Sequence, residues 1–319
     1  MTAALAPTPA GPRSLGPGPA VLAFDVGGTD VKSALVDRSG TLRGLRRTSS
    51  PAPGADSPQR LLDLLVRLAD DLREDHPGIE PDAAGLVVPG IVDAPAGIAV
   101  FSSNLGWRDA PLRDLATARL GLPVAFDHDV ATGSWAEHRI GGARPFDDAV
   151  VLIIGTGVAG TLILDGRLHA GGGYAGEIGH SPLGDWPCPC GARGCLEAVA
   201  SAGAIARRYR DESGRTADGA REVLALAASG DAVASRVWDE ALDALAMSLA
   251  QLTAVLAPQA VVIGGGLSRA GAPLFDELRR RLADRLSFHR LPELVPAELG
   301  GDAGILGSAL RARALREAS

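Results

Sequence analysis

Apolar and polar positions alternate in blocks from Val21 onward. The stretch VLAFDVGGTDVKSALVD predicts an apolar strand, a Gly-Gly turn and a second strand with alternating character. TLRGLRRTSS, which follows closely, predicts a third strand. Two apolar runs predict buried strands. One is AAGLVVPGIVD, in which the strand ends at Pro89-Gly90, and the other is LPVAFDHDV. The first half of the chain therefore supplies the strands of one largely buried sheet.

Leucines at helical spacing predict the helices between these strands. SPQRLLDLLVRLADDLRE has a Ser-Pro start, PLRDLATARLG stops at a glycine, and ATGSWAEHRIG follows the last strand. The second half begins again with a strand, a Gly turn and a strand in DAVVLIIGTGVAGTLILDGRL. Residues 198–256 are mostly helical, QAVVIGGGLS is a strand running into a Gly turn, and PLFDELRRRLADRL and GDAGILGSALRARALRE are helices. The repetition predicts a duplicated α/β unit with a cleft between its halves.

Composition narrows the class of protein. The 319 residues suffice for two domains, and with 46% hydrophobic but only 4% aromatic residues the core consists of Ala, Val, Leu and Ile. A net charge of −7 argues against nucleic acid as a partner. No apolar run can span a bilayer, and the Pro/Gly-rich start resembles neither a signal peptide nor a helix-turn-helix module. With three cysteines and no disulfide framework, a cytoplasmic, soluble protein is expected.

Three glycine turns each follow an apolar strand: DVGGT at 25–29, GTGVAG at 155–160 and GGG at 264–266. Glycine lets backbone amides approach an anion, the threonines add hydroxyl donors, and Asp25 could hold Mg²⁺ directly or through water. Taken alone, each turn is better explained as an ordinary hairpin. None matches the P-loop, and GTGVAG is followed by a strand where a dinucleotide motif requires a helix.

These motifs occur in a recognisable order. AFDVGGTDVK, VVPGIVD, SSNLGW, GTGVAGT, GEIGH, CPCGARGCLE, VVIGGGLS and GDAGILGSAL resemble the ROK family of repressors, open reading frames and kinases, from Val21 to the C-terminus. The resemblance implies an α/β fold of two ribonuclease-H-like domains, as in actin-like ATPases, with ATP in the cleft. It divides the chain into a disordered tail (1–20), a first domain (21–130, completed by a helix at 303–319) and a second domain (131–302) with a zinc-binding loop at 180–197.

The resemblance also assigns site residues. Nucleotide contacts are expected from Asp25, Gly27, Gly28, Thr29, Lys32, Gly155, Thr156, Gly157, Gly265 and Gly266. Sugar contacts are expected from Gly90, Asn104, His128, Glu177, His180 and Glu197. Carboxylates, amides and imidazoles suit a polyol because they exchange hydrogen bonds with adjacent hydroxyls.

A carboxylate at a strand end suits the base in phosphoryl transfer to a sugar hydroxyl. In FDHDVATGSWAE the family pattern places that base at Asp129, although a lone aspartate there would otherwise be interpreted as a helix cap. The sequence departs from the pattern at two positions. His128 replaces the usual Asn, which is expected to alter sugar specificity or weaken activity, and Asp30 adds a carboxylate beside the phosphate turn.

All three cysteines lie within GHSPLGDWPCPCGARGCLE. Cys188, Cys190 and Cys195 with His180 provide three thiolates and one imidazole, the four ligands of a closed, structural zinc site. The ROK zinc motif matches the same residues. Free structural cysteines and a redox pair are the alternatives, but the Gly/Pro-rich loop gives thiols little core to pack in, and Cys-x-Cys is a poor redox motif.

The sequence thus predicts an ATP- and Mg²⁺-dependent hexose kinase containing structural Zn²⁺, acting on glucose at O6 with Asp129 as general base. Alternatives are a kinase for mannose, fructose, N-acetylmannosamine or N-acetylglucosamine, polyphosphate as donor, or a sugar-binding regulator without catalysis. The expected partners are sugar and ATP, without nucleic acid or membrane, and the family resemblance implies a homodimer.

Overall fold

The computed structural model describes residues 14–317. The chain forms two compact units: unit 1 comprises Met1–Gly133 with Gly304–Ser319, and unit 2 comprises Ser134–Ala303. The first change of unit falls inside one helix, α3 (Asp129–Ile140), and the second at the start of another, α9 (Ala303–Glu317). A boundary after residue 130, as expected from the sequence, would also fall within α3.

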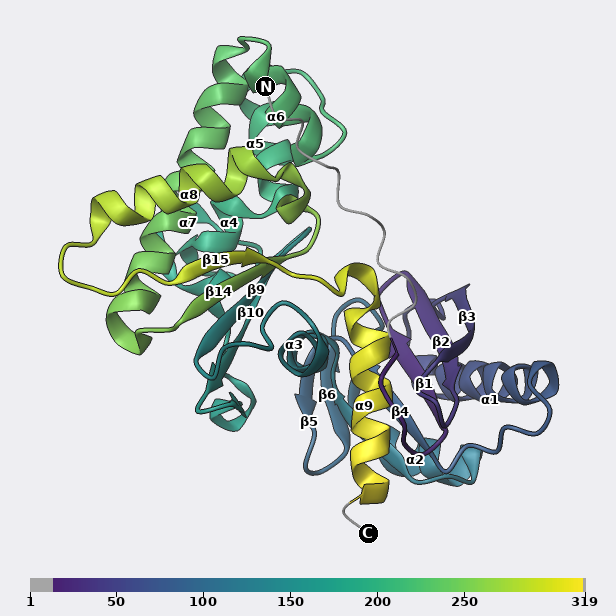
Figure 1. Cartoon of the computed structure of the whole chain (residues 1–319). Coiled ribbons are helices and arrows are strands. Elements are labelled where there is room, and N and C mark those ends of the chain that lie inside the picture. The colour runs from purple at the N-terminus through teal and green to yellow at the C-terminus, as the bar shows by residue number, and fades with distance from the viewer. Residues whose placement is uncertain (1–13, 318–319) are drawn as a thin grey trace. The chain divides into compact units, whose positions relative to one another are not determined.

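Unit 1 is built on a five-stranded sheet in the order β3-β2-β1-β4-β8 (Figure 1). The strands are β1 (Val21–Val26), β2 (Asp30–Val36), β3 (Leu42–Ser49), β4 (Ala83–Val88) and β8 (Val124–His128). The first three form an antiparallel meander, whereas β4 and β8 run parallel to β1. Every residue of β1 and β4 is buried, which explains their continuous apolar sequence.

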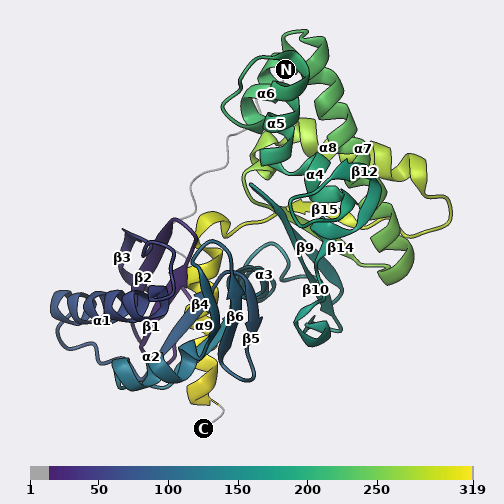
Figure 2. The same ribbon diagram turned by 180° about the vertical axis from the view of Figure 1, so that it is seen from behind.

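Helices cover both faces of this sheet (Figures 1 and 2). On one face, α1 (Ser57–Asp75) and α2 (Leu112–Leu120) pack leucines at helical spacing against β1 side chains such as Leu22 and Phe24. On the other face, α9 approaches so closely that a Cβ on Gly85 would lie 2.1 Å from the Ser308 carbonyl oxygen. The Ser308 hydroxyl in turn donates to the Phe24 carbonyl. The last helix of the chain is therefore part of the core of unit 1.

The three-stranded sheet of unit 1 does not follow from the hydrophobic pattern. It contains β5 (Ile91–Asp93), β6 (Ile98–Ser102) and β7 (Trp107–Ala110). In the run AAGLVVPGIVD the predicted buried strand is β4, which ends just before Pro89-Gly90, whereas the following residues form β5 in the other sheet. Strands of three to five residues leave too short an alternation to detect.

The prediction of a disordered tail over residues 1–20 is wrong for residues 14–20, while residues 1–13 lie outside the described residues. The Arg313 guanidinium of α9 donates to the carbonyls of Gly16, Pro19 and Asp37, and Ala20 is fully buried. Backbone hydrogen bonds also join Leu15 to Gly40 and Gly18 to Arg38. Pro/Gly-rich composition suggested disorder, but an arginine almost 300 positions away satisfies these carbonyls.

Unit 2 repeats the strand order of unit 1 in its own sheet, β11-β10-β9-β14-β15. The strands are β9 (Ala149–Ile154), β10 (Val158–Leu164), β11 (Arg167–His169), β14 (Ala260–Gly264) and β15 (Glu293–Pro296). The first three are again an antiparallel meander, and β14 and β15 are parallel to β9. The predicted mixed α/β fold and its duplication are confirmed.

Most helices of unit 2 lie on one face of its sheet, as both views show. They are α4 (Leu196–Ala200), α5 (Ala202–Ser213), α6 (Ala220–Ala228), α7 (Ala232–Leu256) and α8 (Ala272–Arg285). A hairpin, β12 (Pro182–Pro187) and β13 (Arg193–Cys195), and short 3-10 turns, η1 (Gly171–Gly173), η2 (Ile178–His180), η3 (Leu267–Ala270) and η4 (Gly300–Asp302), complete it. Across residues 14–317, no helix is both long and apolar enough to cross a membrane.

Candidate functional site

Asp25, near the end of β1, is the charged centre of the glycine turn in unit 1. Its Oδ2 atom lies 2.9 Å from Lys32 Nζ on β2, and the residue is 9% exposed. A Cβ on Gly304 would lie 2.6 Å from the same oxygen, so the first turn of α9 packs directly against the carboxylate. An ammonium group and a helix N-terminus thus stabilise its negative charge.

The turn after Asp25 leaves backbone groups exposed. Gly27 N–H donates to the Asp30 carbonyl at 2.8 Å, and the Ser50 hydroxyl donates to the Gly27 carbonyl at 2.7 Å. Gly28 and Thr29, by contrast, are exposed. A Cβ on Gly28 would lie 3.3 Å from Asn104 Nδ2, so the predicted phosphate turn and the predicted sugar-binding asparagine lie side by side.

Two further predicted features of unit 1 have specific surroundings. Gly90 follows β4 with a φ of 106°, and a Cβ there would lie 2.2 Å from the Phe101 carbonyl oxygen, so a side chain would not fit. The Asp30 carboxylate lies 3.4 Å from the Arg47 guanidinium on β3. The extra acid beside the turn therefore has an arginine partner.

Asp129 is the first residue of α3, directly after β8. Its Oδ1 atom accepts a hydrogen bond from Val130 N–H at 2.7 Å and lies 3.3 Å from Nε2 of His128. The other ring nitrogen, His128 Nδ1, accepts from Ala131 N–H at 3.3 Å, as the side chain of a helix cap does. Both nitrogens of the histidine predicted to bind sugar thus face protein groups.

The surroundings of Asp129 shift its acidity. Burial raises the pKa of this carboxyl above its ordinary value, since desolvation disfavours the charged form. The His128 ring and the Val130 N–H lower the pKa, whereas the negative charge of Asp25 raises it, and burial prevails. A carboxyl with a raised pKa is a better proton acceptor, as a general base requires.

In unit 2, the turn at 155–157 is organised by a carboxylate from a helix. Glu197 of α4 accepts the N–H of Val158 at 2.7 Å through Oε2. A Cβ on Gly157 would lie 2.4 Å from that same oxygen. Gly155 N–H bonds to the Gly157 carbonyl at 2.9 Å, and the Gly155 carbonyl accepts from Ala202 N–H. The predicted sugar-binding acid therefore also supports the predicted phosphate turn.

Other predicted residues of unit 2 gather around this turn. Gly265 comes directly after β14 and has a φ of 81°. It lies so close to β9 that a Cβ would be 2.4 Å from the Ile154 carbonyl oxygen, and Gly266 is the next residue. A Cβ on Gly179 would lie 2.1 Å from the Val158 carbonyl oxygen, which brings η2 with His180 beside the start of β10. Glu177, Thr156 and His180 are exposed.

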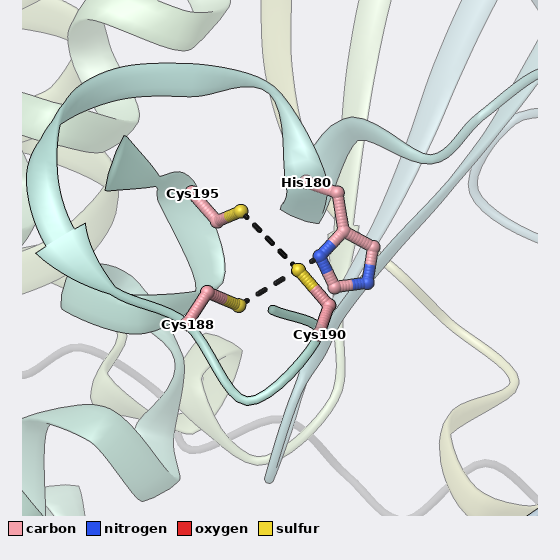
Figure 3. Close-up of side chains that lie close together, drawn as sticks. All are labelled: His180, Cys188, Cys190 and Cys195. Carbon is pink, nitrogen blue, oxygen red and sulfur yellow. Dashed lines mark hydrogen bonds between the residues drawn. The ribbon is translucent and has the colours of Figure 1, made fainter. Parts of the chain in front are cut away.

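Figure 3 shows how the histidine and the three cysteines converge. The potential ligand atoms of His180, Cys188, Cys190 and Cys195 all lie within 4.8 Å of one another. Cys190 and Cys195 Sγ are 3.7 Å apart, and Cys188 Sγ is 3.9 Å from His180 Nδ1. Ligand atoms of a tetrahedral zinc ion with Zn–S bonds of about 2.3 Å stand about 3.8 Å apart, so the spacing suits that metal.

The thiols are free and lie in unlike environments. Cys188 and Cys195 are buried and Cys190 is exposed, and all three are unpaired cysteines. Burial raises the pKa of Cys195 to about 12, while hydrogen bonding from the Ala192 backbone lowers the pKa of Cys190. A bound cation would reverse the penalty on the buried thiolate.

Two interactions near these sites had no counterpart in the sequence-based assignment. Arg311 of α9 lies 2.9 Å from Asp127 at the end of β8. Glu137 of α3, 1% exposed, accepts hydrogen bonds from the N–H groups of Gly142, Glu298 and Leu299. Both sets of contacts join segments far apart in the chain, which a local pattern does not reveal. In the sequence, both Asp127 and Glu137 lie within the motif FDHDVATGSWAE, but the motif does not indicate their partners.

The chain is similar to known sugar kinases over most of its length. The ROK family model matches residues 21–314. A glucokinase of Thermotoga maritima is 35% identical over 311 residues, covering 91% of this chain and 96% of that enzyme. An N-acetylmannosamine kinase of Salmonella heidelberg is 31% identical over 299 residues, covering 92% and 98%.

A solved structure shows the same similarity in three dimensions. The ROK family glucokinase of Streptomyces griseus, crystallised with glucose and AMPPNP, superposes with a TM-score of 0.76 at 28% identity. The match covers 92% of this chain and 99% of that one.

Proposed function

This chain belongs to the ROK family, and we propose that it transfers the γ-phosphoryl group of ATP to a hexose, with glucose at O6 as the first candidate. The observation that carries the proposal is the Asp129 carboxyl at the start of α3. Its raised pKa suits a base that accepts the hydroxyl proton as the phosphoryl group arrives. The glucokinase relatives support glucose as the acceptor.

Unit 1 is assigned the base and part of the phosphate contacts. The exposed turn of Gly28 and Thr29 offers amides and a hydroxyl to phosphate oxygens, and Lys32, held by Asp25, offers a positive charge. Asn104, beside the turn, is assigned to a sugar hydroxyl. Mg²⁺ would be bound mainly by the phosphates of ATP, and it supplies charge neutralisation on the transferring group.

Unit 2 is assigned the remaining contacts. The turn at 155–157 and the glycines 265–266 are assigned to the nucleotide, because glycines let their backbone amides approach phosphate and Thr156 adds a hydroxyl donor. Glu177, His180 and Glu197 are assigned to sugar hydroxyls. Glu197 has one oxygen engaged by Val158 N–H, which leaves its other oxygen for the sugar.

We also propose that His180, Cys188, Cys190 and Cys195 bind a structural Zn²⁺. The spacing of their ligand atoms supports this, and so does the donor set of three thiols and one imidazole. Four protein ligands leave no coordination site for water, so the metal would shape the loop. Nδ1 of His180 faces the sulfur atoms in Figure 3, and Nε2 remains for a sugar hydroxyl.

The test is sugar-dependent formation of ADP. Purified protein is assayed with ATP and Mg²⁺ on glucose, mannose, fructose, N-acetylmannosamine and N-acetylglucosamine, with polyphosphate as an alternative donor. Glucose is expected to give the highest kcat/KM. If no sugar gives turnover with either donor, the kinase proposal is refuted and a sugar-binding regulator remains. Calorimetry would then detect binding of the sugar. The N-acetylmannosamine kinase relative makes that sugar the second candidate.

The base is tested separately by Asp129→Asn. Turnover is expected to fall by about 10³-fold with sugar affinity retained, because the amide cannot accept the proton. Asp127→Asn is the matched control: it makes the same change two positions earlier, where the carboxylate pairs with Arg311. Near-normal turnover in Asp129→Asn would refute the assignment. A cytoplasmic homodimer remains a prediction, which light scattering and cell fractionation test.

A further inference from the structure

His128 has an arrangement that sugar binding does not explain. Its Nδ1 atom is 3.3 Å from the Ala131 N–H, and its Nε2 atom is 3.3 Å from Asp129 Oδ1. The ring therefore spans the first turn of α3, from a backbone donor to the carboxylate of the next residue. The side chains of His128 and Asp129 are 34% and 24% exposed, so this pair is only partly open to water.

The backbone contact determines the tautomer of the neutral ring. Since Nδ1 accepts a hydrogen bond from Ala131, it has no proton, and the single ring proton must reside on Nε2. Nε2 lies 3.3 Å from Asp129 Oδ1, the same oxygen that accepts from Val130 N–H. The Nε2 atom of His128 and the N–H of Val130 thus both lie against Oδ1, and neither of these contacts is made to Oδ2.

Charged groups of the neighbouring elements complete the surroundings. Asp25 on β1 acts on Asp129 as a negative charge and is itself paired with Lys32 of β2. Asp127, on the same strand as His128, is paired with Arg311 of α9. Lys32 and Arg311 thus already have carboxylate partners, which leaves His128 to engage Asp129.

We propose that His128 is a positioning residue for the base: its Nε2–H group holds Oδ1 of Asp129, so that Oδ2 is directed to the sugar hydroxyl and receives its proton. This rests on the proposed function, since it takes Asp129 as the base. It reassigns His128 from sugar binding to orientation of the carboxylate. The replacement of the family's asparagine then changes the base rather than the sugar contacts.

Two substitutions separate the two ends of the ring. His128→Asn keeps an oxygen near the backbone that can accept from Ala131 N–H, but lacks an atom at the Nε2 position. His128→Gln extends an amide donor toward that position but caps the helix less well. His76→Asn, the same exchange at the C-terminus of α1, is the control. Thermal melting of all variants monitors folding.

For His128→Asn, kcat is expected to fall about 10-fold with the KM for sugar within about threefold, because only the base is misplaced. The pKa of Asp129 is expected to rise by about half a unit or more on loss of the donor, shifting the acid limb of the pH–rate profile upward. His128→Gln should recover most of both effects, and His76→Asn should show neither.

A titration of the Asp129 carboxyl by ¹³C NMR, assigned with Asp129→Asn, provides the decisive measurement without turnover. An unchanged Asp129 pKa in His128→Asn overturns the proposal, whether or not the protein proves to be a kinase. A large rise in sugar KM with unchanged kcat also overturns it, because it would show that His128 contacts the sugar. Absence of turnover in the wild type refutes the proposed function alone.

Discussion

The β1–β2 and β9–β10 turns occupy the same place in two sheets of the same strand order, but different interactions stabilise them. In unit 1 the strand carries its own acid, Asp25, which Lys32 and the start of α9 hold. In unit 2 the acid is Glu197, which α4 brings to the turn from outside the sheet. The first turn is supported by residues of β2 and α9, and the second by a residue of α4.

The cysteine loop leads directly into α4, whose Leu196, Val199 and Ala200 are buried in the core of unit 2. Cys195 ends β13 and α4 begins at the next residue, so Glu197 stands two positions from a predicted metal ligand. Cys188, Cys195 and Ala198 pack as one small cluster, with Trp186 against it. Little apolar core supports this loop, so a metal would have to supply the missing stabilisation.

Removal of metal should therefore have the largest effect and act on unit 2. Chelation, or Cys190→Ser, which removes an exposed ligand with little packing, is expected to lower sugar affinity by about 10–100-fold and to destabilise the loop. Elemental analysis should find one zinc per chain, and Zn²⁺ should restore the chelated protein. A native preparation without metal, with full sugar affinity, would contradict the assignment.

Loss of the cation in unit 1 should have the next largest effect. Lys32→Ala is expected to lower kcat/KM by about 10–50-fold, because it leaves Asp25 unpaired where phosphate charge must be stabilised. Lys32→Arg keeps the charge but would pair with Asp25 as a planar fork, so a smaller loss is expected.

Lys32 is also the only lysine in the sequence, which provides a direct measurement. Amine-selective acylation followed by mass spectrometry should modify this side chain, and ATP should protect it. Equal labelling with and without ATP, together with normal turnover in Lys32→Ala, would show that this cation has no part in phosphate binding.

A matched pair of glycine substitutions compares the two turns with a smaller change at each site. Gly304→Ala places a methyl group against the Asp25 carboxylate, and Gly157→Ala places one against Glu197. The first is expected to lower kcat/KM for ATP, and the second to raise the KM for sugar, each by about 10-fold, since the acids are displaced rather than removed. Steady-state kinetics with each substrate varied in turn distinguishes the two variants.

The same contrast explains what could be predicted from the sequence. Both hairpins and their glycine turns followed from continuous apolar strands, and the Cys/His cluster from the spacing of four ligand types. Three features could not be predicted, because each depends on a partner far along the chain. They are the ordered structure of residues 14–20, the Asp127–Arg311 pair and the amide contacts of Glu137. His128 was recognised as a departure, but its contacts with Ala131 and Asp129 required the structure.

The smallest predicted effect concerns two aspartates, each at the start of a helix. Burial raises the pKa of Asp129, whereas hydrogen bonding from the Ala234 backbone lowers the pKa of Asp231, which caps α7. A raised pKa stabilises the fold at low pH, and that stabilisation is lost as pH rises through the folded-state pKa. A lowered pKa stabilises it above the unfolded-state value, and this is lost as pH falls.

Asparagine at the two positions should therefore shift the melting temperature in opposite directions. At pH 7, Asp129→Asn is expected to raise it by about 1–3 °C, because the amide avoids the cost of a buried charge, whereas Asp231→Asn should lower it. The Asp129→Asn difference should shrink as pH falls through the raised pKa of Asp129, whereas the Asp231→Asn difference should shrink only below about pH 4, as pH falls through the lowered pKa of Asp231. Melting curves across this range measure them, and shifts of the same sign at pH 7 would show that the Asp129 charge is not costly. If Asp129→Asn stabilises the fold while abolishing turnover, unit 1 maintains an unfavourable carboxylate because the reaction requires it.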